Sequence, residues 1–201
     1  RKHRRLLHEY VGERRERLQR YHSPAVVERI MAQAHGDGSG VLEAQDRDIT
    51  VLFADLVGFT TLSETLPPSE VASLLNRFFS EMTDAIFAED GTVDKFIGDA
   101  ILAVFGAPVE QRDHARRAVR AAQAMRRAVA RLNAEGGRQL RVRYAINSGV
   151  AIAGDVGSAR RREYTVLGDV VNTTARLESL AEPDQIIVSR ATYDRISPPI
   201  A

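Results

Sequence analysis

After residue 40 the chain alternates between short apolar runs and longer segments whose apolar residues recur at helical spacing. Short apolar runs bounded by turn residues are typical of buried strands, and the helical spacing is typical of helices packed against them. The expected elements are a strand at 49–54, a helix at 71–86, strands at 93–97 and 100–105, a helix at 115–132 and a strand at 142–153. This β-α-β-β-α-β order predicts a ferredoxin-like sandwich of the mixed α/β (α+β) class.

Further elements follow this core. Residues 154–163 are rich in Gly and Arg and are expected to form a loop. A strand at 164–167, a helix at 170–180, a strand at 186–188 and a short helix at 190–196 come after it. The sandwich should therefore carry additional strands and helices at its C-terminal side.

The first 40 residues differ in character from the rest. Residues 1–20 hold eight Lys and Arg against three Glu, and residues 1–21 have the pattern of a polar helix. Ser23 and Pro24 are N-cap and first-turn residues of a second, short helix. A Gly-rich stretch at 36–40 then indicates a flexible linker. We expect a helical connector and linker at 1–40 and a separate domain at 41–201.

Composition and charge exclude several classes of protein. The basic N-terminal segment could contact nucleic acid or an anionic surface, or it could be a solvated charged helix. Beyond residue 20 the chain holds 24 acidic and 20 basic side chains, which argues against nucleic acid as a partner. The absence of cysteine excludes disulfides and Cys-ligated zinc. Neither a run of 18 apolar residues nor a signal peptide is present, so we expect no membrane span and a cytoplasmic location.

Two aspartates stand where a strand ends or turns. Asp55 follows the apolar run at 49–54, and Asp99 lies in the Gly98-Asp99 turn between two strands. Taken singly, Asp55 could cap the next helix and Asp99 could be an ordinary turn residue. If the two strands are neighbours, both carboxylates lie near one edge of the sheet and could bind a hard divalent cation. Two such ions about 4 Å apart can serve in-line displacement at phosphorus.

The segment after Asp55 has two interpretations. Gly58 allows a tight turn, and the next helix is expected to begin near Thr60 or Thr61. The free N–H groups at the start of this helix could hold phosphate oxygens. The segment could equally be an ordinary strand-to-helix turn.

Lys95 is one of two lysines in a chain with 26 arginines, and it lies in an apolar run. We expect its ammonium to be buried, and a buried ammonium must be paired or hydrogen-bonded. It could pair with Asp94 or a remote carboxylate, or it could donate to a ring acceptor of a purine.

Asn172 and Arg176 are four residues apart in an expected helix and therefore share one face. Arg176 could pair with Asp169 or Glu178, or its guanidinium could stabilise charge that develops on a phosphoryl group while Asn172 places a sugar. Thr165 precedes this helix by one loop and, taken alone, is a structural strand residue.

Three segments together resemble the catalytic domain of the class III nucleotidyl cyclases. They are residues 50–60 (TVLFADLVGFT), 94–100 (DKFIGDA) and 164–177 (YTVLGDVVNTTARL). Their order and spacing match the family, and the resemblance covers roughly residues 48–197. It implies an enzyme that is active as a homodimer, with sites shared between two chains.

The resemblance implies a role for each motif residue. Asp55 and Asp99, with the backbone carbonyl of Leu56, would hold two Mg²⁺ or Mn²⁺ ions in each active site. The triphosphate would bind at the loop formed by Val57, Gly58, Phe59 and Thr60.

The other protomer would supply the remaining groups. Lys95 and Thr165 would read the purine, Asn172 would orient the ribose, and Arg176 would stabilise the transition state at the α-phosphate. Lysine is a donor and adenine N1 is an acceptor, so we expect an adenylate cyclase that converts ATP to 3′,5′-cyclic AMP and pyrophosphate. A guanylate cyclase and a non-catalytic nucleotide sensor are the alternatives.

Three features depart from the commonest family pattern. Many adenylate cyclases have Asp where this chain has Thr165, and the Thr form resembles a subgroup activated by bicarbonate. The closing strands of the family domain are expected to lie beyond Ala201. Residues 1–34 resemble the connectors that join regulatory domains to cyclase domains, which implies a fused or upstream regulatory domain.

Overall fold

The computed structural model describes residues 12–196 apart from 14, 17, 21, 34–41, 137 and 159–161. One sheet organises the chain and comprises β1 (Gln45–Leu56), β2 (Thr92–Ile97), β3 (Ala100–Phe105), β4 (Val142–Gly157), β5 (Arg162–Leu167) and β6 (Ile186–Val188). The strand order is β2-β3-β1-β4-β5, and β6 pairs in parallel with β4. All other pairings are antiparallel. The ferredoxin-like prediction, with strands added to it, is confirmed.

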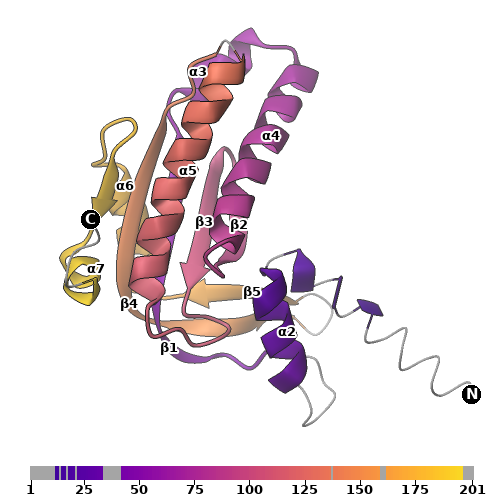
Figure 1. The fold of residues 1–201 in the computed structure, drawn as a ribbon, viewed down its shortest axis with the longest axis vertical. Helices are drawn as coiled ribbons and strands as arrows, with labels where there is room; N and C mark the ends of the chain where they lie inside the picture. The colour runs from indigo at the N-terminus through magenta and orange to yellow at the C-terminus, as the bar shows by residue number, and fades with distance from the viewer. Residues whose placement is uncertain are drawn as a thin grey trace, which may run out of the picture.

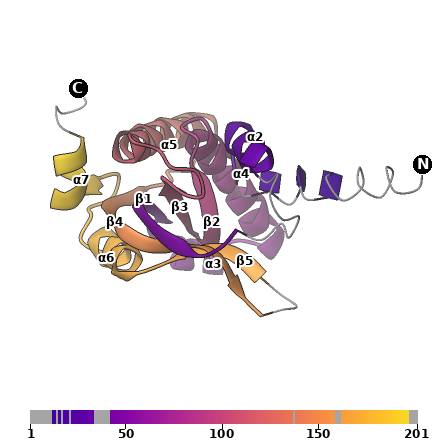
Figure 2. The ribbon, with the colours of Figure 1, turned by 90° about the horizontal axis from the view of Figure 1, so that it is seen from below.

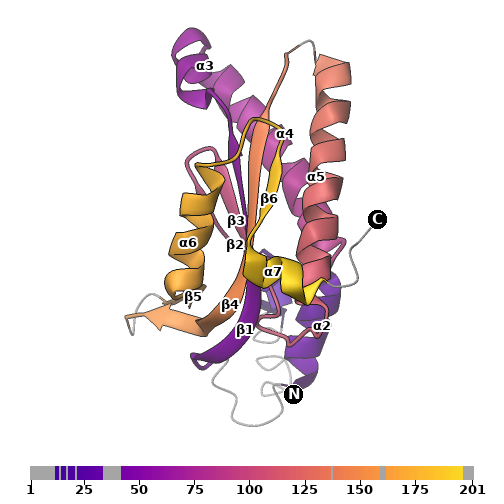
Figure 3. The same cartoon turned by 90° about the vertical axis from the view of Figure 1, so that its left-hand side faces the viewer.

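Helices cover both faces of the sheet. They are α2 (Pro24–Gln33), α3 (Phe59–Thr65), α4 (Pro68–Phe87), α5 (His114–Gly136), α6 (Asp169–Glu178) and α7 (Arg190–Arg195). Seen with the sheet edge-on, α4 and α5 lie on one side and α6 lies on the other (Figure 3). The apolar stripes of α4 and α5 therefore face the sheet, as their helical spacing predicted.

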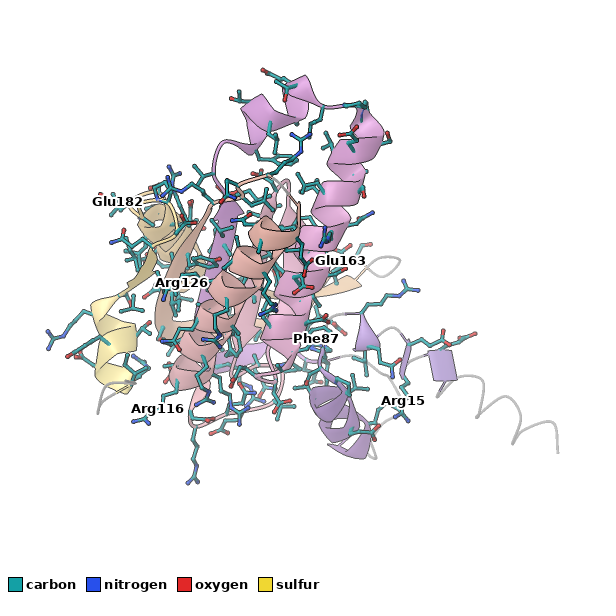
Figure 4. The ribbon with its side chains drawn as sticks, turned by 45° about the horizontal axis from the view of Figure 1, so that its top comes forward. Arg15, Phe87, Arg116, Arg126, Glu163 and Glu182 are labelled. Atoms are coloured by element: carbon teal, nitrogen blue, oxygen red, sulfur yellow. The ribbon has the colours of Figure 1, made fainter. Side chains whose placement is uncertain are left out.

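Two apolar clusters hold these layers together. The larger lies under α4 and α5 and includes Leu52, Phe78, Met125 and Tyr144. The smaller is formed by strand residues together with α6 and includes Val51, Val104, Val166 and Val170. Because Val51 and Leu52 are adjacent on β1, the alternation of strand side chains supplies both clusters from one strand. Arg116 and Arg126 of α5 lie away from these clusters (Figure 4).

The sheet curls strongly. Strands β2 and β5 stand at opposite ends of the strand order, yet the view from below shows them approaching one another (Figure 2). A hydrogen bond from Lys95 Nζ to Thr165 Oγ1, 3.1 Å long, joins them. This curl brings two distant sequence motifs together.

The N-terminal segment that includes α2 packs beside β2 and α4. Helix α2 lies beside the lower end of α4 (Figure 1), and Leu18, Val27 and Ile30 form a small buried cluster there. His22 Nδ1 lies 2.9 Å from Thr92 Oγ1 on β2. Ser23 Oγ accepts a hydrogen bond from the Val26 N–H, which is the cap that the sequence predicted. The predicted linker at 36–40 and most of the predicted first helix lie outside the described residues.

One predicted loop is largely strand. The segment 154–163 was expected to be irregular, but β4 continues to Gly157 and β5 begins at Arg162. Asp155 pairs with Tyr164, and Gly154 pairs with Thr165. A strand residue at Gly154 has no side chain, which allows the backbone of Ala44 to pass close to it. No helix in the described part of the chain is long and apolar enough to cross a bilayer.

Candidate active site

The two predicted metal ligands come together at one end of the sheet. Strands β1 and β3 are antiparallel neighbours, and Asp55 pairs with Ala100, the residue after Asp99. Gly98 closes the turn before Asp99 with a φ of 62°, a conformation that favours glycine. The structure thus meets the condition on which the metal-site hypothesis depended, and the metal-binding role stays a prediction.

Negative charge accumulates at this end of the sheet. The pKa of Asp55 is raised to about 6, chiefly by burial and further by the charges of Asp99 and Glu178, against the opposing effect of Arg143. Burial also raises the pKa values of Asp99 and Glu178. Carboxylates that crowd together in a partly desolvated place are stabilised in their charged form by a cation.

Two residues of this cluster were missed in the sequence. Arg143 lies opposite Asp55 in the pairing of β1 with β4, and its Nη1 is 3.9 Å from Glu178 Oε1. Neither Arg143 Nε nor Glu178 Oε1, both buried, makes a hydrogen bond within the described residues. A loosely paired, partly exposed cation beside two carboxylates provides a place where a charged ligand could be bound.

The donor set fits a divalent cation at an open site. Among the described residues, no three acidic or histidine side chains surround one point closely enough to form a complete cage. Mg²⁺ commonly uses only one or two carboxylates and completes its shell with phosphate oxygens and water. Asp55 and Asp99 suit that kind of site, with substrate supplying the missing ligands.

The loop after Asp55 is set by Gly58. Gly58 is the N-cap residue of α3, which starts at Phe59. It has a φ of 72° and provides no side-chain hydrogen bond to cap the helix. The Val57 N–H donates to the Arg141 carbonyl at 2.8 Å, so the loop is anchored to the segment leading into β4. This geometry leaves the triphosphate role of residues 57–60 a prediction.

The proposed purine readers form a second group. Lys95 Nζ lies 3.1 Å from Thr165 Oγ1 and 3.2 Å from Asp94 Oδ2. The expectation of a buried ammonium was wrong, because the side chain of Lys95 is 48% exposed whereas that of Asp94 is 1% exposed. The pairing with Asp94 is present, and it leaves the ammonium accessible from outside.

The α6 residues form a third group. Asn172 and Arg176 are both exposed, one turn apart, while Val170, Thr174 and Glu178 face inward. The neighbours proposed for Arg176 are engaged elsewhere: Thr173 Oγ1 donates to Asp169, and Glu178 faces Arg143. The Asn172 and Arg176 side chains are thus directed away from the cluster around Asp55.

These groups do not converge within one chain. Figures 1 and 3 both place β5, which carries Thr165, far from α3, which directly follows the Asp55 end of β1. The charges that shift the pKa of Asp55 are those of Asp99, Glu178 and Arg143, and the charge of Lys95 is not among them. The described part of the chain therefore holds the predicted site residues in separate groups.

Residues 41–199 match the family model described as the adenylate and guanylate cyclase catalytic domain. The chain belongs to this family. The resemblance stated from the three motifs is thereby confirmed, and the domain that it covered coincides closely with the matched residues.

Curated relatives of this cyclase domain are longer proteins. Adenylate cyclase 1 of Rhizobium meliloti is 37% identical over 138 residues, which are 67% of this chain and 21% of that protein. An uncharacterized protein of Mycobacterium tuberculosis is 40% identical over 153 residues, which are 75% of this chain and 26% of that protein. The cyclase domain thus spans about a quarter of the length of these relatives.

Solved structures with the same fold include cyclases of both base specificities. The adenylyl cyclase CyaB from P. aeruginosa is 37% identical with a TM-score of 0.74, covering 80% of this chain and 85% of that one. The guanylyl cyclase Cya2 is 41% identical with a TM-score of 0.73, covering 76% and 79%. Identity alone therefore does not choose between ATP and GTP.

Proposed function

We propose that this cyclase domain converts ATP to 3′,5′-cyclic AMP and pyrophosphate. The observation that carries the proposal is the contact between the half-exposed Lys95 Nζ and the buried Thr165 Oγ1. Adenine offers an acceptor at N1 and a donor at its amino group, which match an ammonium and a hydroxyl oxygen. Guanine offers the reverse pattern, so a site that reads it needs an acceptor opposite N1.

The reaction would be an in-line displacement at the α-phosphorus. A bond forms between the ribose 3′ oxygen and the α-phosphorus, the bond to the bridging oxygen of pyrophosphate breaks, and the 3′-hydroxyl proton passes to solvent. Asp55 and Asp99 would hold divalent ions, whose presence lowers the pKa of that hydroxyl and neutralises phosphate charge.

The other residues would position the substrate. Asn172 would hold the ribose, and Arg176 would donate to oxygens on the α-phosphorus as charge develops there. Arg143 faces Asp55 and would meet the polyphosphate chain, exchanging its long contact with Glu178 for phosphate oxygens. The loop at 57–60 would complete the binding of the triphosphate.

A second copy of the chain would complete each site. The Asp55 group and the Lys95 group lie apart, so one chain cannot place both on one nucleotide. Exposed apolar side chains occur on the strands near the purine readers: Phe96 on β2 is 50% exposed, Ile152 on β4 is 44% and Leu167 on β5 is 49%. Ile152 and Leu167 are direct cross-strand partners. Such a surface is typical of an interface, which supports a homodimer.

Regulation would enter through the connector. His22 contacts Thr92 on β2 and packs edge-to-face on Tyr164, the residue before Thr165. A movement of the connector would therefore affect both strands that carry the purine readers.

We also propose bicarbonate as an activator. Cyclase assays at fixed pH and ionic strength with bicarbonate or chloride test this proposal, and equal rates would exclude bicarbonate activation for this chain.

Loss of the metal ligands tests the function directly. Asp55→Ala and Asp99→Ala should each abolish cyclic AMP formation while the circular dichroism spectrum stays unchanged. Asp46→Ala is the matched control, because Asp46 is an exposed aspartate at the other end of β1. Full activity of either ligand variant at saturating Mn²⁺ would contradict the two-metal reaction.

A further inference from the structure

Asp94 occupies an irregular position in the sheet. Val93 pairs with Ala103 and Lys95 pairs with Leu102, so Asp94 is an additional residue that forms a β-bulge. A bulge redirects side chains and is frequent beside active sites. Here it buries the Asp94 side chain, whereas the next side chain, Lys95, is half-exposed.

The buried carboxylate holds both proposed purine readers. Asp94 Oδ2 lies 3.3 Å from Thr165 Oγ1 and 3.2 Å from Lys95 Nζ. The three polar groups thus form a closed triangle, completed by the bond of 3.1 Å from Lys95 to Thr165. It joins the two ends of the curled sheet.

The chemistry of these three groups fixes the direction of each hydrogen bond. An ammonium has donors only, so Lys95 donates to Thr165 and to Asp94. Thr165 has one proton, and its oxygen already accepts from Lys95, so the proton is directed to the Asp94 carboxylate. The Thr165 oxygen therefore retains one lone pair for an outside partner, and it has no proton to offer.

We propose that Asp94 is a positioning residue that sets purine selectivity by holding the Thr165 hydroxyl as an acceptor. The proposal rests on the proposed function, in which Lys95 faces N1 of the base and Thr165 faces the substituent at position 6. The amino group of adenine then donates to the free lone pair, while the O6 of guanine meets a second lone pair and is repelled.

The burial of Asp94 has a cost that packing alone does not explain. Its Oδ1 atom is buried and has no hydrogen-bond partner in the described part of the chain. Burial also raises the pKa of this carboxyl, against the effects of Lys95, the Thr165 hydroxyl and the Val166 backbone. An apolar residue at a buried strand position would avoid that penalty. A carboxylate that is costly to bury and that contacts both readers is better explained by selectivity.

A double-mutant cycle on the full chain tests the proposal. The readout is the ratio of dissociation constants for 3′-deoxy-GTP and 3′-deoxy-ATP with Mn²⁺, which needs no turnover because both analogues lack the attacking hydroxyl. Asp94→Leu removes the acceptor, so the Thr165 proton can turn to the base. We expect the preference for the adenine analogue to fall by about tenfold or more, the typical effect of one hydrogen bond in a desolvated site.

The same change in a Thr165→Val background should leave the ratio within about twofold, because no hydroxyl remains to be oriented. Thr192→Val, which removes a buried hydroxyl from α7, is the control and should also leave the ratio unchanged. If Asp94→Leu does not fold, Asp94→Asn carries the same cycle, since its amide no longer obliges the Thr165 proton to point inward.

The proposal is overturned if Asp94→Leu leaves the ratio of dissociation constants unchanged when Thr165 is present. It is also overturned if Asp94→Leu changes that ratio equally with Thr165 and with Thr165→Val. A wild-type protein without preference for 3′-deoxy-ATP would also overturn it. If wild type makes cyclic AMP but Asp94→Leu does not change the ratio of dissociation constants, this inference fails and the proposed function stands. If wild type makes no cyclic nucleotide but Asp94→Leu lowers the adenine preference only when Thr165 is present, the proposed function fails and the inference stands.

Discussion

The ammonium of Lys95 lies 3.1 Å from the hydroxyl of Thr165, although 70 residues separate them in the chain. Their strands are at opposite ends of the strand order, so only the curl of the sheet brings them together. The pair is accessible on the Lys95 side and is supported from behind by Asp94. This arrangement leads to a direct prediction for base recognition.

Lys95→Met should lower kcat/KM for ATP by more than about tenfold, because it removes a charged donor to adenine N1 and keeps the length of the side chain. Initial rates of cyclic AMP formation measure this. Arg126→Met, which removes an exposed cation from α5, is the control and should have no effect. A rate within about twofold of wild type for Lys95→Met would show that Lys95 does not read the base.

Mixing two inactive variants tests the shared sites. Asp55→Ala and Asn172→Ala should each be nearly inactive, because each site of either homodimer contains one defect. After subunit exchange about half of the dimers are mixed, and each of these has one site with both defects and one with neither. The mixture should regain about a quarter of wild-type activity. No recovery, with exchange verified independently, would mean that all site residues come from one chain.

Glu178 should control the ionisation of Asp55 in the metal-free protein. The charge of Glu178 contributes to raising the pKa of Asp55 to about 6, so Glu178→Gln should move that pKa down toward its usual range. Carboxyl ¹³C NMR against pH measures the shift. Glu182→Gln, at the exposed Glu182 just beyond α6 (Figure 4), is the control. An Asp55 pKa that does not change in Glu178→Gln would contradict the electrostatic coupling described here.

His22 should make the protein less stable at mildly acidic pH. Burial lowers the pKa of His22 from 6.5 to about 4, so the unfolded state binds more protons than the folded state between these values. Stability is therefore fully present above pH 6.5 and falls as the pH drops toward 4. From pH 7 to pH 5 the loss should be about 2 kcal/mol, since one pKa unit corresponds to about 1.4 kcal/mol.

Urea unfolding of wild type and His22→Phe at both pH values measures this loss. Phenylalanine keeps an aromatic ring against Tyr164 but cannot be protonated. The His22→Phe protein should lose less stability between pH 7 and pH 5, and the effect of the buried His114 is common to both proteins. An equal loss in both would show that His22 does not remain docked in the folded state.

Much of the carboxylate site was accessible from the sequence. An apolar run that ends at Asp55 and a Gly98-Asp99 turn are local patterns, and both appear in the structure as predicted. Arg143 and Glu178 were missed because their proximity depends on non-local pairing. Arg143 is the second residue of β4 and meets Asp55 only through the antiparallel register, which a single sequence does not specify.

The error at Lys95 has a different physical cause. In a regular strand Asp94 and Lys95 would point to opposite faces, and the apolar neighbours gave no indication of which one is buried. The bulge at Asp94 settles this by adding a residue to β2, so that the carboxylate is enclosed and the ammonium is not. No residue type in this run is specific to a bulge, so the bulge at Asp94 could not be predicted from the sequence.

A competition assay between ATP and GTP measures the base preference of the cyclase domain. The cyclase domain is supplied with equal concentrations of ATP and GTP, with Mg²⁺ and separately with Mn²⁺, and the initial rates of cyclic AMP and cyclic GMP formation are measured together. Their ratio is the ratio of the two kcat/KM values. We expect cyclic AMP to exceed cyclic GMP by more than about tenfold and Asp55→Ala to abolish both products. Predominant cyclic GMP, or no cyclic product with either metal, would contradict it.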